Sequence, residues 1–76
     1  DRVLARTSHL PHVAAAAVAV GLRPGEERFA AGGFRDVTRV AGGDPDLWAG
    51  ILLANREAVA DELRRHVEQC LGVVNA

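Results

Sequence analysis

One stretch of this sequence is apolar on every side, and it limits most strongly how the chain can fold. Residues 13–20 read VAAAAVAV and follow Pro11 in a run with helical spacing. A helix that is hydrophobic all round has to be covered all round. The chain has only 76 residues, and a domain of this size buries about 60% of the surface that its unfolded form exposes. We therefore expect a partner to cover part of this helix.

The composition argues against the other common ways of stabilising so small a domain. Cys70 is the only cysteine, so no disulfide can form within the chain. A metal site is poorly supported, because the sequence has three histidines but neither an HExxH motif nor paired cysteines. One unpaired cysteine fits a reducing compartment, so we expect a cytoplasmic protein. The apolar stretch is far shorter than the roughly 20 residues of a membrane span, and we expect no membrane contact.

The charges are balanced, with nine basic and ten acidic residues and a net charge of −1. Such a surface does not favour binding to nucleic acid or to anionic lipid. All the basic residues are arginines, which genomic base composition can explain. A single arginine therefore needs support from its position before it is interpreted as a carboxylate-binding residue. The chain begins at Asp1, which suggests an excised domain, although a processed or incomplete chain would look the same.

The pattern predicts an all-α fold of about four helices and no strand. Pro11 lacks a backbone donor, so we expect a kink or a restart near Ser8. Asp44 and Pro45 are typical of a helix N-cap and first position. Asn55 can cap the last helix, or the last two helices can be one helix with a bend there. The expected helices cover approximately residues 3–22, 29–40, 45–54 and 56–73.

The last helix has an apolar stripe and a polar stripe, which we expect to face the core and the solvent respectively. The apolar stripe contains Val59, Leu63, Val67, Cys70, Leu71 and Val74, and the polar stripe contains Asp61, Glu62, Arg64, Arg65, Glu68 and Gln69.

Two clusters carry residues that could do chemistry. His9 and His12 lie three residues apart and share one face of a continuous helix. They either satisfy backbone groups around Pro11 or present an imidazole to a polar ligand. In the second cluster, Asp36 and Arg39 are a surface ion pair of well under 1 kcal/mol, or Arg39 binds a substrate carboxylate in bidentate fashion. The preceding Gly32–Gly33 pair marks a late helix start or a close backbone approach.

Both clusters lie within motifs that resemble a known family. The segments DRVLARTSHLPHVAAAAV and FAAGGFRDVTRVAGGDPDLWAGILLANREAV are similar to the C-terminal helical domain of prephenate dehydrogenases, including the arogenate-using relatives. The similarity extends over about residues 1–71. SHLPH and GGFRDVTR-x-A-x-x-DP-x-LW are long, ordered motifs, so the resemblance is specific.

The resemblance implies that residues 1–76 are one helical dimerisation and substrate-binding domain. Its fold would resemble the C-terminal domain of 6-phosphogluconate dehydrogenase, with two copies interlocked as a homodimer. The parent enzyme would add an N-terminal Rossmann domain that binds NAD or NADP. It would convert prephenate to 4-hydroxyphenylpyruvate by oxidative decarboxylation on the route to tyrosine, or use arogenate. The catalytic base and the nucleotide-binding glycines would lie outside this chain, which alone would bind no cofactor and be inactive.

By position, four residues correspond to substrate-site residues of the family. His12 is similar to the substrate-contacting histidine, and His9 lines the same region. Arg39 is similar to the arginine that binds a substrate carboxylate, which favours the functional interpretation of this residue. Asp36 matches an acid of an ionic network at the cleft, which can reach across the dimer. The alternative is a helical interaction module without catalysis, in which these residues are structural.

Overall fold

The computed structural model describes residues 1–76, and every regular element in it is helical. This confirms the predicted all-α fold. The longer helices agree with the predicted ranges to within a few residues. No helix is long and apolar enough to cross a membrane. In chain order the elements are α1 (Arg2–Leu4), the π-helix η1 (Ala5–His9), α2 (Leu10–Val20), the 3-10 helix η2 (Glu27–Phe29), α3 (Gly32–Arg39), α4 (Pro45–Ala54) and α5 (Arg56–Val74).

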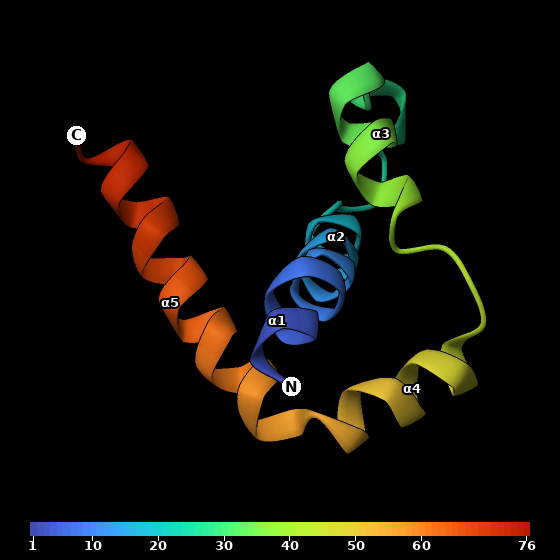
Figure 1. Ribbon diagram of the computed structural model, residues 1–76. Helices are drawn as coiled ribbons and strands as arrows, with labels where there is room; N and C mark the ends of the chain where they lie inside the picture. The colour runs from blue at the N-terminus through green and yellow to red at the C-terminus, as the bar shows by residue number, and fades with distance from the viewer.

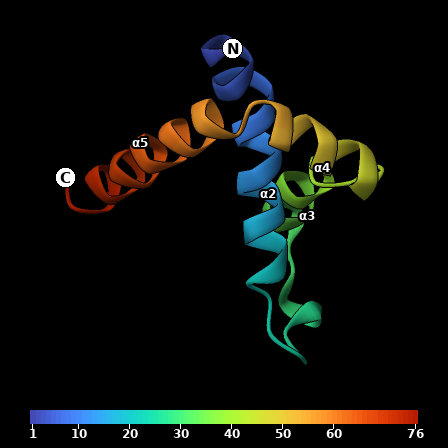
Figure 2. The same ribbon diagram turned by 90° about the horizontal axis from the view of Figure 1, so that it is seen from below.

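The first three elements form one continuous helical rod (Figure 2). The irregularity near Ser8, expected as a kink or a restart, is a widened turn within this rod. In the π-helix η1, the backbone N–H of Leu10 donates to the carbonyl of Ala5, five residues back. Pro11 follows directly and has no N–H to donate, and its ring crowds the carbonyl four residues before it. A π-type turn is a known way for a helix to absorb such an interruption. The proline therefore changes the pitch and does not end the helix.

The glycine pair Gly32–Gly33 marks the start of α3, so the second helix begins later than we expected. Ala31 holds the N-cap position in an extended conformation. A Cβ atom added to either glycine would meet no atom within 4 Å. Within this chain, the pair therefore marks a late helix start and not a close backbone approach.

The expected capping of α4 is confirmed, since the Asp44 carboxylate accepts a hydrogen bond of 3.0 Å from the backbone N–H of Asp46. Helices α4 and α5 are separate and diverge from Asn55 (Figure 1). Asn55 occupies the N-cap position of α5, but its side chain makes no capping hydrogen bond. It reaches the N-terminal helix instead. The rod of α1, η1 and α2 crosses this junction, with α4 and α5 extending to either side (Figure 2).

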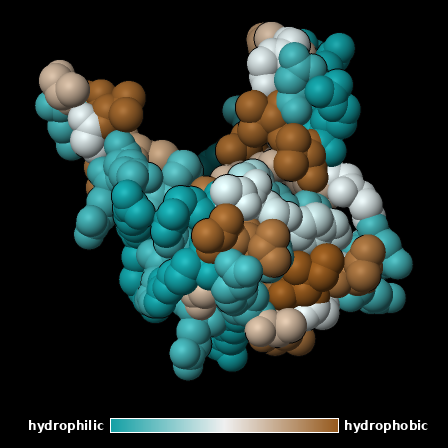
Figure 3. Space-filling model, viewed as in Figure 1, coloured by the Kyte–Doolittle hydropathy of each residue, from teal (hydrophilic) through white to brown (hydrophobic).

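The chain buries very few side chains by itself. Only six of the 76 residues are buried, and the apolar ones among them are Ala5, Ala15 and Val59. Hydrophobic residues are visible on the surface over the middle of the molecule (Figure 3). Exposed apolar surface on this scale is typical of an interface. The exposed large hydrophobic residues are Val3, Leu4, Val18, Val20, Phe29, Val37, Val40, Leu47, Leu53, Val67, Leu71, Val73 and Val74.

The two stripes of α5 do not divide into core and solvent as predicted. Val59 is buried, but Val67, Leu71 and Val74 further along the apolar stripe are exposed. Glu62, which we placed on the solvent side, is buried. The N-terminal rod covers only the first part of α5, and it approaches from the side that carries Glu62. The distal half of the helix extends away from the rest of the chain (Figure 1).

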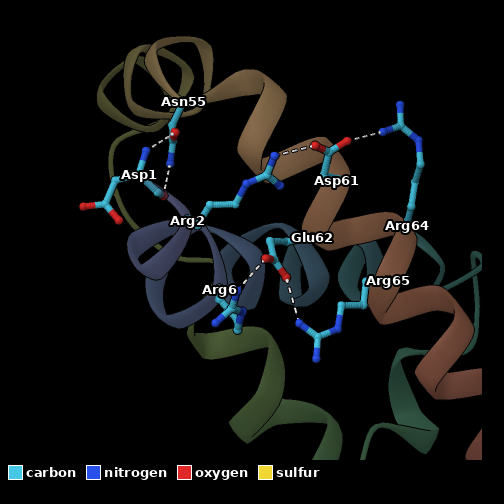
Figure 4. A network of polar contacts seen from close by, with 8 residues as sticks. All are labelled: Asp1, Arg2, Arg6, Asn55, Asp61, Glu62, Arg64 and Arg65. Carbon is cyan, nitrogen blue, oxygen red and sulfur yellow. Dashed lines mark hydrogen bonds and ion pairs between the residues drawn. The ribbon is translucent and has the colours of Figure 1, made fainter.

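Ion pairs join the rod to α5 (Figure 4). Arg6 donates to Glu62 at 2.9 Å, and the Glu62 side chain is only 7% exposed. Arg2 donates to Asp61 at 2.7 Å, and Arg64 donates to the other oxygen of Asp61 at 2.8 Å. Hydrogen bonding to Arg6 lowers the pKa of Glu62, and hydrogen bonding to Arg2 lowers the pKa of Asp61. A carboxylate that is nearly covered needs such a partner to remain charged.

The depressed pKa of Glu62 predicts a loss of stability in acid. Its ordinary value is 4.5, and the folded value lies below that. The Arg6–Glu62 pair therefore contributes fully above the unfolded pKa, and its contribution is lost as the pH falls through the folded pKa. We expect E62Q to melt at a lower temperature at pH 7 and to show a weaker acid dependence than the unmodified chain. E57Q, at an exposed position of the same helix, is the control; equal behaviour of the two variants would contradict this role.

Candidate functional site

The two histidines of the SHLPH motif lie together on one face of the rod, as their spacing predicts. His9 ends the π-helix η1 and His12 is in the first turn of α2. Both residues are buried, at 9% exposure each. Imidazole rings that are so well covered need packing partners for their flat faces and hydrogen-bond partners for their nitrogens. Helix α4 supplies a packing partner for the ring faces.

Trp48 of α4 contacts both histidines. Its indole lies flat against the His12 ring, with the centroids 3.7 Å apart and the planes inclined by 7°. The same indole meets His9 edge to face, at 6.3 Å and 86°. Trp48 is not among the predicted site residues. Its role was not predicted, although it is the single tryptophan of the chain and immediately follows the capped start of α4.

Three of the four ring nitrogens of His9 and His12 make no hydrogen bond within the chain. Nδ1 of His9 lies 3.2 Å from Nδ2 of Asn55. The chain has no buried side-chain nitrogen or oxygen atom without a hydrogen-bond partner. Neither Nε2 of His9 nor either nitrogen of His12 makes a hydrogen bond within the chain, so these atoms must be accessible. These three nitrogens keep their hydrogen-bonding capacity for a partner outside the chain. Of the two histidines only His12 lines the pocket at this site, whereas His9 lies behind it in contact with Trp48.

An open pocket of about 370 Å³ lies beside His12 and Trp48. Its walls are mostly apolar, and α2, α4 and the segment between α3 and α4 contribute to them. Gly43 in that segment has φ of +127°, and a Cβ atom added there would lie 3.4 Å from Nε1 of Trp48. A concave apolar surface with a few polar atoms is the usual form of a small-molecule site. The lining residues are His12, Val13, Ala16, Ala41, Gly43, Asp44, Pro45, Trp48, Ala49 and Leu52.

Two larger hollows lie on the polar surface near the start of α5, with volumes of about 470 and 600 Å³. Neither contains any of the predicted site residues. Charged side chains make up much of the lining of both. We therefore take the smaller pocket beside His12 as the candidate site.

Arg39 and Asp36 are placed differently from the histidines. They form a loose ion pair at 3.7 Å, and their side chains are 78% and 73% exposed. Neither residue lines the pocket. Arg39 ends α3, two residues before Ala41, which does line it. Within this chain, Arg39 and Asp36 therefore form the surface ion pair that was one of the two predicted alternatives. The guanidinium group of Arg39 stays available for a ligand or a second chain. The role of both residues in substrate binding stays a prediction.

No three His, Cys, Asp or Glu side chains come together as a metal-binding group would. His66 is not near the other histidines in sequence and lies 3.5 Å from Cys70 on α5. The expectation that the chain holds no metal stays a prediction.

Stacking on His12 predicts how the fluorescence of Trp48 responds to mutation. In H12A the indole loses its covering ring and becomes more exposed to water. We expect its emission to move to longer wavelength and its quenching by acrylamide to increase. The chain has one tryptophan, so the signal is unambiguous. H66A, which removes a histidine from α5, should leave the emission unchanged; an unchanged spectrum in H12A would argue against the stack.

Comparisons with known proteins identify the domain. The family described as "Prephenate dehydrogenase, dimerization domain" matches residues 1–75. A prephenate dehydrogenase of Bacillus subtilis (strain 168) is 39% identical over 85 residues, which cover 91% of this chain and 23% of that protein. A cyclohexadienyl dehydrogenase of Zymomonas mobilis is 48% identical over 67 residues, covering 78% of this chain and 22% of that protein.

A solved structure agrees with these relatives. The crystal structure of Synechocystis arogenate dehydrogenase matches with a TM-score of 0.74 and 30% identity, over 99% of this chain and 31% of that one. The chain therefore spans less than a third of the length of each of these proteins. The match over residues 1–75 shows that this chain belongs to the prephenate dehydrogenase dimerization-domain family.

Proposed function

We propose that this chain is the dimerisation and substrate-binding domain of a dehydrogenase that acts on prephenate or arogenate. The observation that carries the proposal is the site at which His12 stacks on Trp48 beside an apolar pocket. This site lies within the two motifs that resemble the family. The printed names of the similar proteins are those of prephenate, cyclohexadienyl and arogenate dehydrogenases.

The chemistry of the pocket suits such a substrate. Prephenate combines an apolar cyclohexadiene ring with a ring carboxylate and a pyruvyl side chain. The apolar walls and the indole of Trp48 can cover the ring, while the free nitrogens of His9 and His12 can bond to its oxygens. Arg39 can add a bidentate, charge-assisted contact to a carboxylate once a ligand or a second chain covers it. Asp36 would then share Arg39 with the substrate as part of an ionic network.

The oxidation itself needs residues outside this chain. In the proposed reaction, a hydride leaves the ring carbon that bears the hydroxyl group, and the ring carboxylate departs as carbon dioxide. The electrons of the broken C–C bond make the ring aromatic, so that the hydroxyl group becomes the phenol of the product. NAD or NADP would accept the hydride. The chain has no strand and hence no strand–glycine turn for a dinucleotide, so it does not fit the cofactor. We assign that role to a Rossmann domain elsewhere in the parent protein, and to this chain the holding of the substrate.

The alternative function is a helical interaction module without catalysis. The sequence that precedes Asp1 in the parent protein separates the two proposals. A strand followed by GxGxxG and a helix, about 150 or more residues upstream, would support the dehydrogenase. A start codon close to Asp1 would exclude it.

Arg39 provides the kinetic test in the full-length enzyme. Loss of a charge-assisted pair costs about 1.5–3 kcal/mol, so we expect R39A to raise the KM for prephenate roughly 10- to 100-fold. The KM for the nucleotide should stay within a factor of about two. R64A is the matched control, because Arg64 pairs with Asp61 on the surface of α5 and lies outside the pocket. An unchanged prephenate KM in R39A would remove Arg39 from the site.

A further inference from the structure

Asn55 makes three polar contacts with the N-terminal rod although it is 46 residues from the nearest of its partners. Its Oδ1 accepts from the terminal ammonium group of Asp1 at 2.7 Å. Its Nδ2 donates to the carbonyl of Asp1 at 2.8 Å and lies 3.2 Å from Nδ1 of His9. Both Asp1 contacts are visible in Figure 4. The residue at the junction of α4 and α5 thus touches one of the two site histidines directly.

These contacts fix which way the Asn55 amide faces. The carbonyl of Asp1 can only accept a hydrogen bond, so the amide atom beside it has to be the NH₂ group. The orientation therefore follows from this carbonyl alone and does not depend on the histidine. With one N–H of Nδ2 on Asp1, its second N–H points to His9.

The orientation of the amide in turn fixes the state of His9. Nδ1 of His9 faces an N–H donor, so it has to act as an acceptor and carry no proton. A neutral imidazole has one donor and one acceptor nitrogen, so the proton is on Nε2. That nitrogen makes no hydrogen bond within the chain, and His9 contacts Trp48, which lines the pocket.

We propose that Asn55 is a positioning residue that holds His9 as the Nε2–H tautomer, so that His9 offers a hydrogen-bond donor to an oxygen atom of the substrate. The role toward substrate rests on the proposed function, whereas the tautomer assignment does not. His12 needs no such control, because neither of its nitrogens is engaged within the chain. The two histidines therefore differ: Asn55 sets the donor of His9, while the tautomer of His12 is left to the ligand.

The tautomer can be measured by two-bond ¹H–¹⁵N correlation spectra of the histidine rings in the full chain. The spectra are recorded at about pH 9, where histidines are neutral. We expect His9 to show an unprotonated Nδ1 and an Nε2–H tautomer in at least about fivefold excess, as one hydrogen bond of ordinary strength would produce. Assignment uses H9Q, which removes only the His9 signals. A protonated Nδ1 on His9 would overturn the proposal.

The variant N55D gives the more decisive test. Free imidazole already favours the Nε2–H form modestly, so a reversal of the tautomer is stronger evidence than its presence in the unmodified chain. Aspartate has the shape of asparagine but presents acceptor oxygens only, so the proton of His9 should move to Nδ1. The matched control is N75D, which makes the same change at the C-cap of α5 and should leave His9 unaltered. An unchanged His9 pattern in N55D would overturn the assignment, and the wild-type spectrum decides by itself if N55D does not fold.

A kinetic arm separates this inference from the proposed function. In the full-length enzyme, N55D should raise the KM for prephenate about tenfold or more, while the nucleotide KM stays unchanged. A reversed tautomer with an unchanged prephenate KM would leave the tautomer assignment standing and overturn the donor role of His9. No binding of prephenate by the unmodified enzyme would overturn the proposed function itself, whatever the spectra show.

Discussion

The covering of helix α2 is the constraint on which the rest of this structure depends. The stretch VAAAAVAV has no polar face to leave in water, yet the chain buries little beyond Ala5, Ala15 and Val59 among its apolar residues. Helix α5 extends away from the rod, with much of its apolar stripe exposed. We therefore expect an isolated chain of this shape to be at best marginally stable, because it leaves so much hydrophobic surface in water. The family description as a dimerization domain supports our proposal that a second copy of the chain covers this surface.

Because few apolar side chains are buried within the chain, polar contacts also hold its helices together. The ion pair of Arg6 with Glu62 and the hydrogen bonds of Asn55 both tie the rod to α5 or to its junction with α4. The same junction sets the place of Trp48, which stacks on His12. The candidate site is thus built where three helical segments meet. Its geometry depends on the few contacts that hold those segments together.

Local signals in the sequence predicted the elements well, and contacts between distant residues were harder to foresee. The Asp44–Pro45 cap and the two helices after it follow from rules that act within a few residues. The burial of Glu62 does not, because its partner lies 56 residues away. His9 and His12 share a face through helical spacing. Their contact with Trp48 is a tertiary contact, and the wide turn at η1 depends on how the helix accommodates Pro11.

The central claim is that a second copy of the chain completes this fold. Sedimentation equilibrium at several concentrations, paired with urea unfolding at the same concentrations, tests it most directly. The account predicts a particle of twice the 8.0 kDa chain mass and an unfolding midpoint that rises with protein concentration, because association stabilises the folded state by mass action. A well-folded monomer at micromolar concentration, with a midpoint independent of concentration, would contradict it.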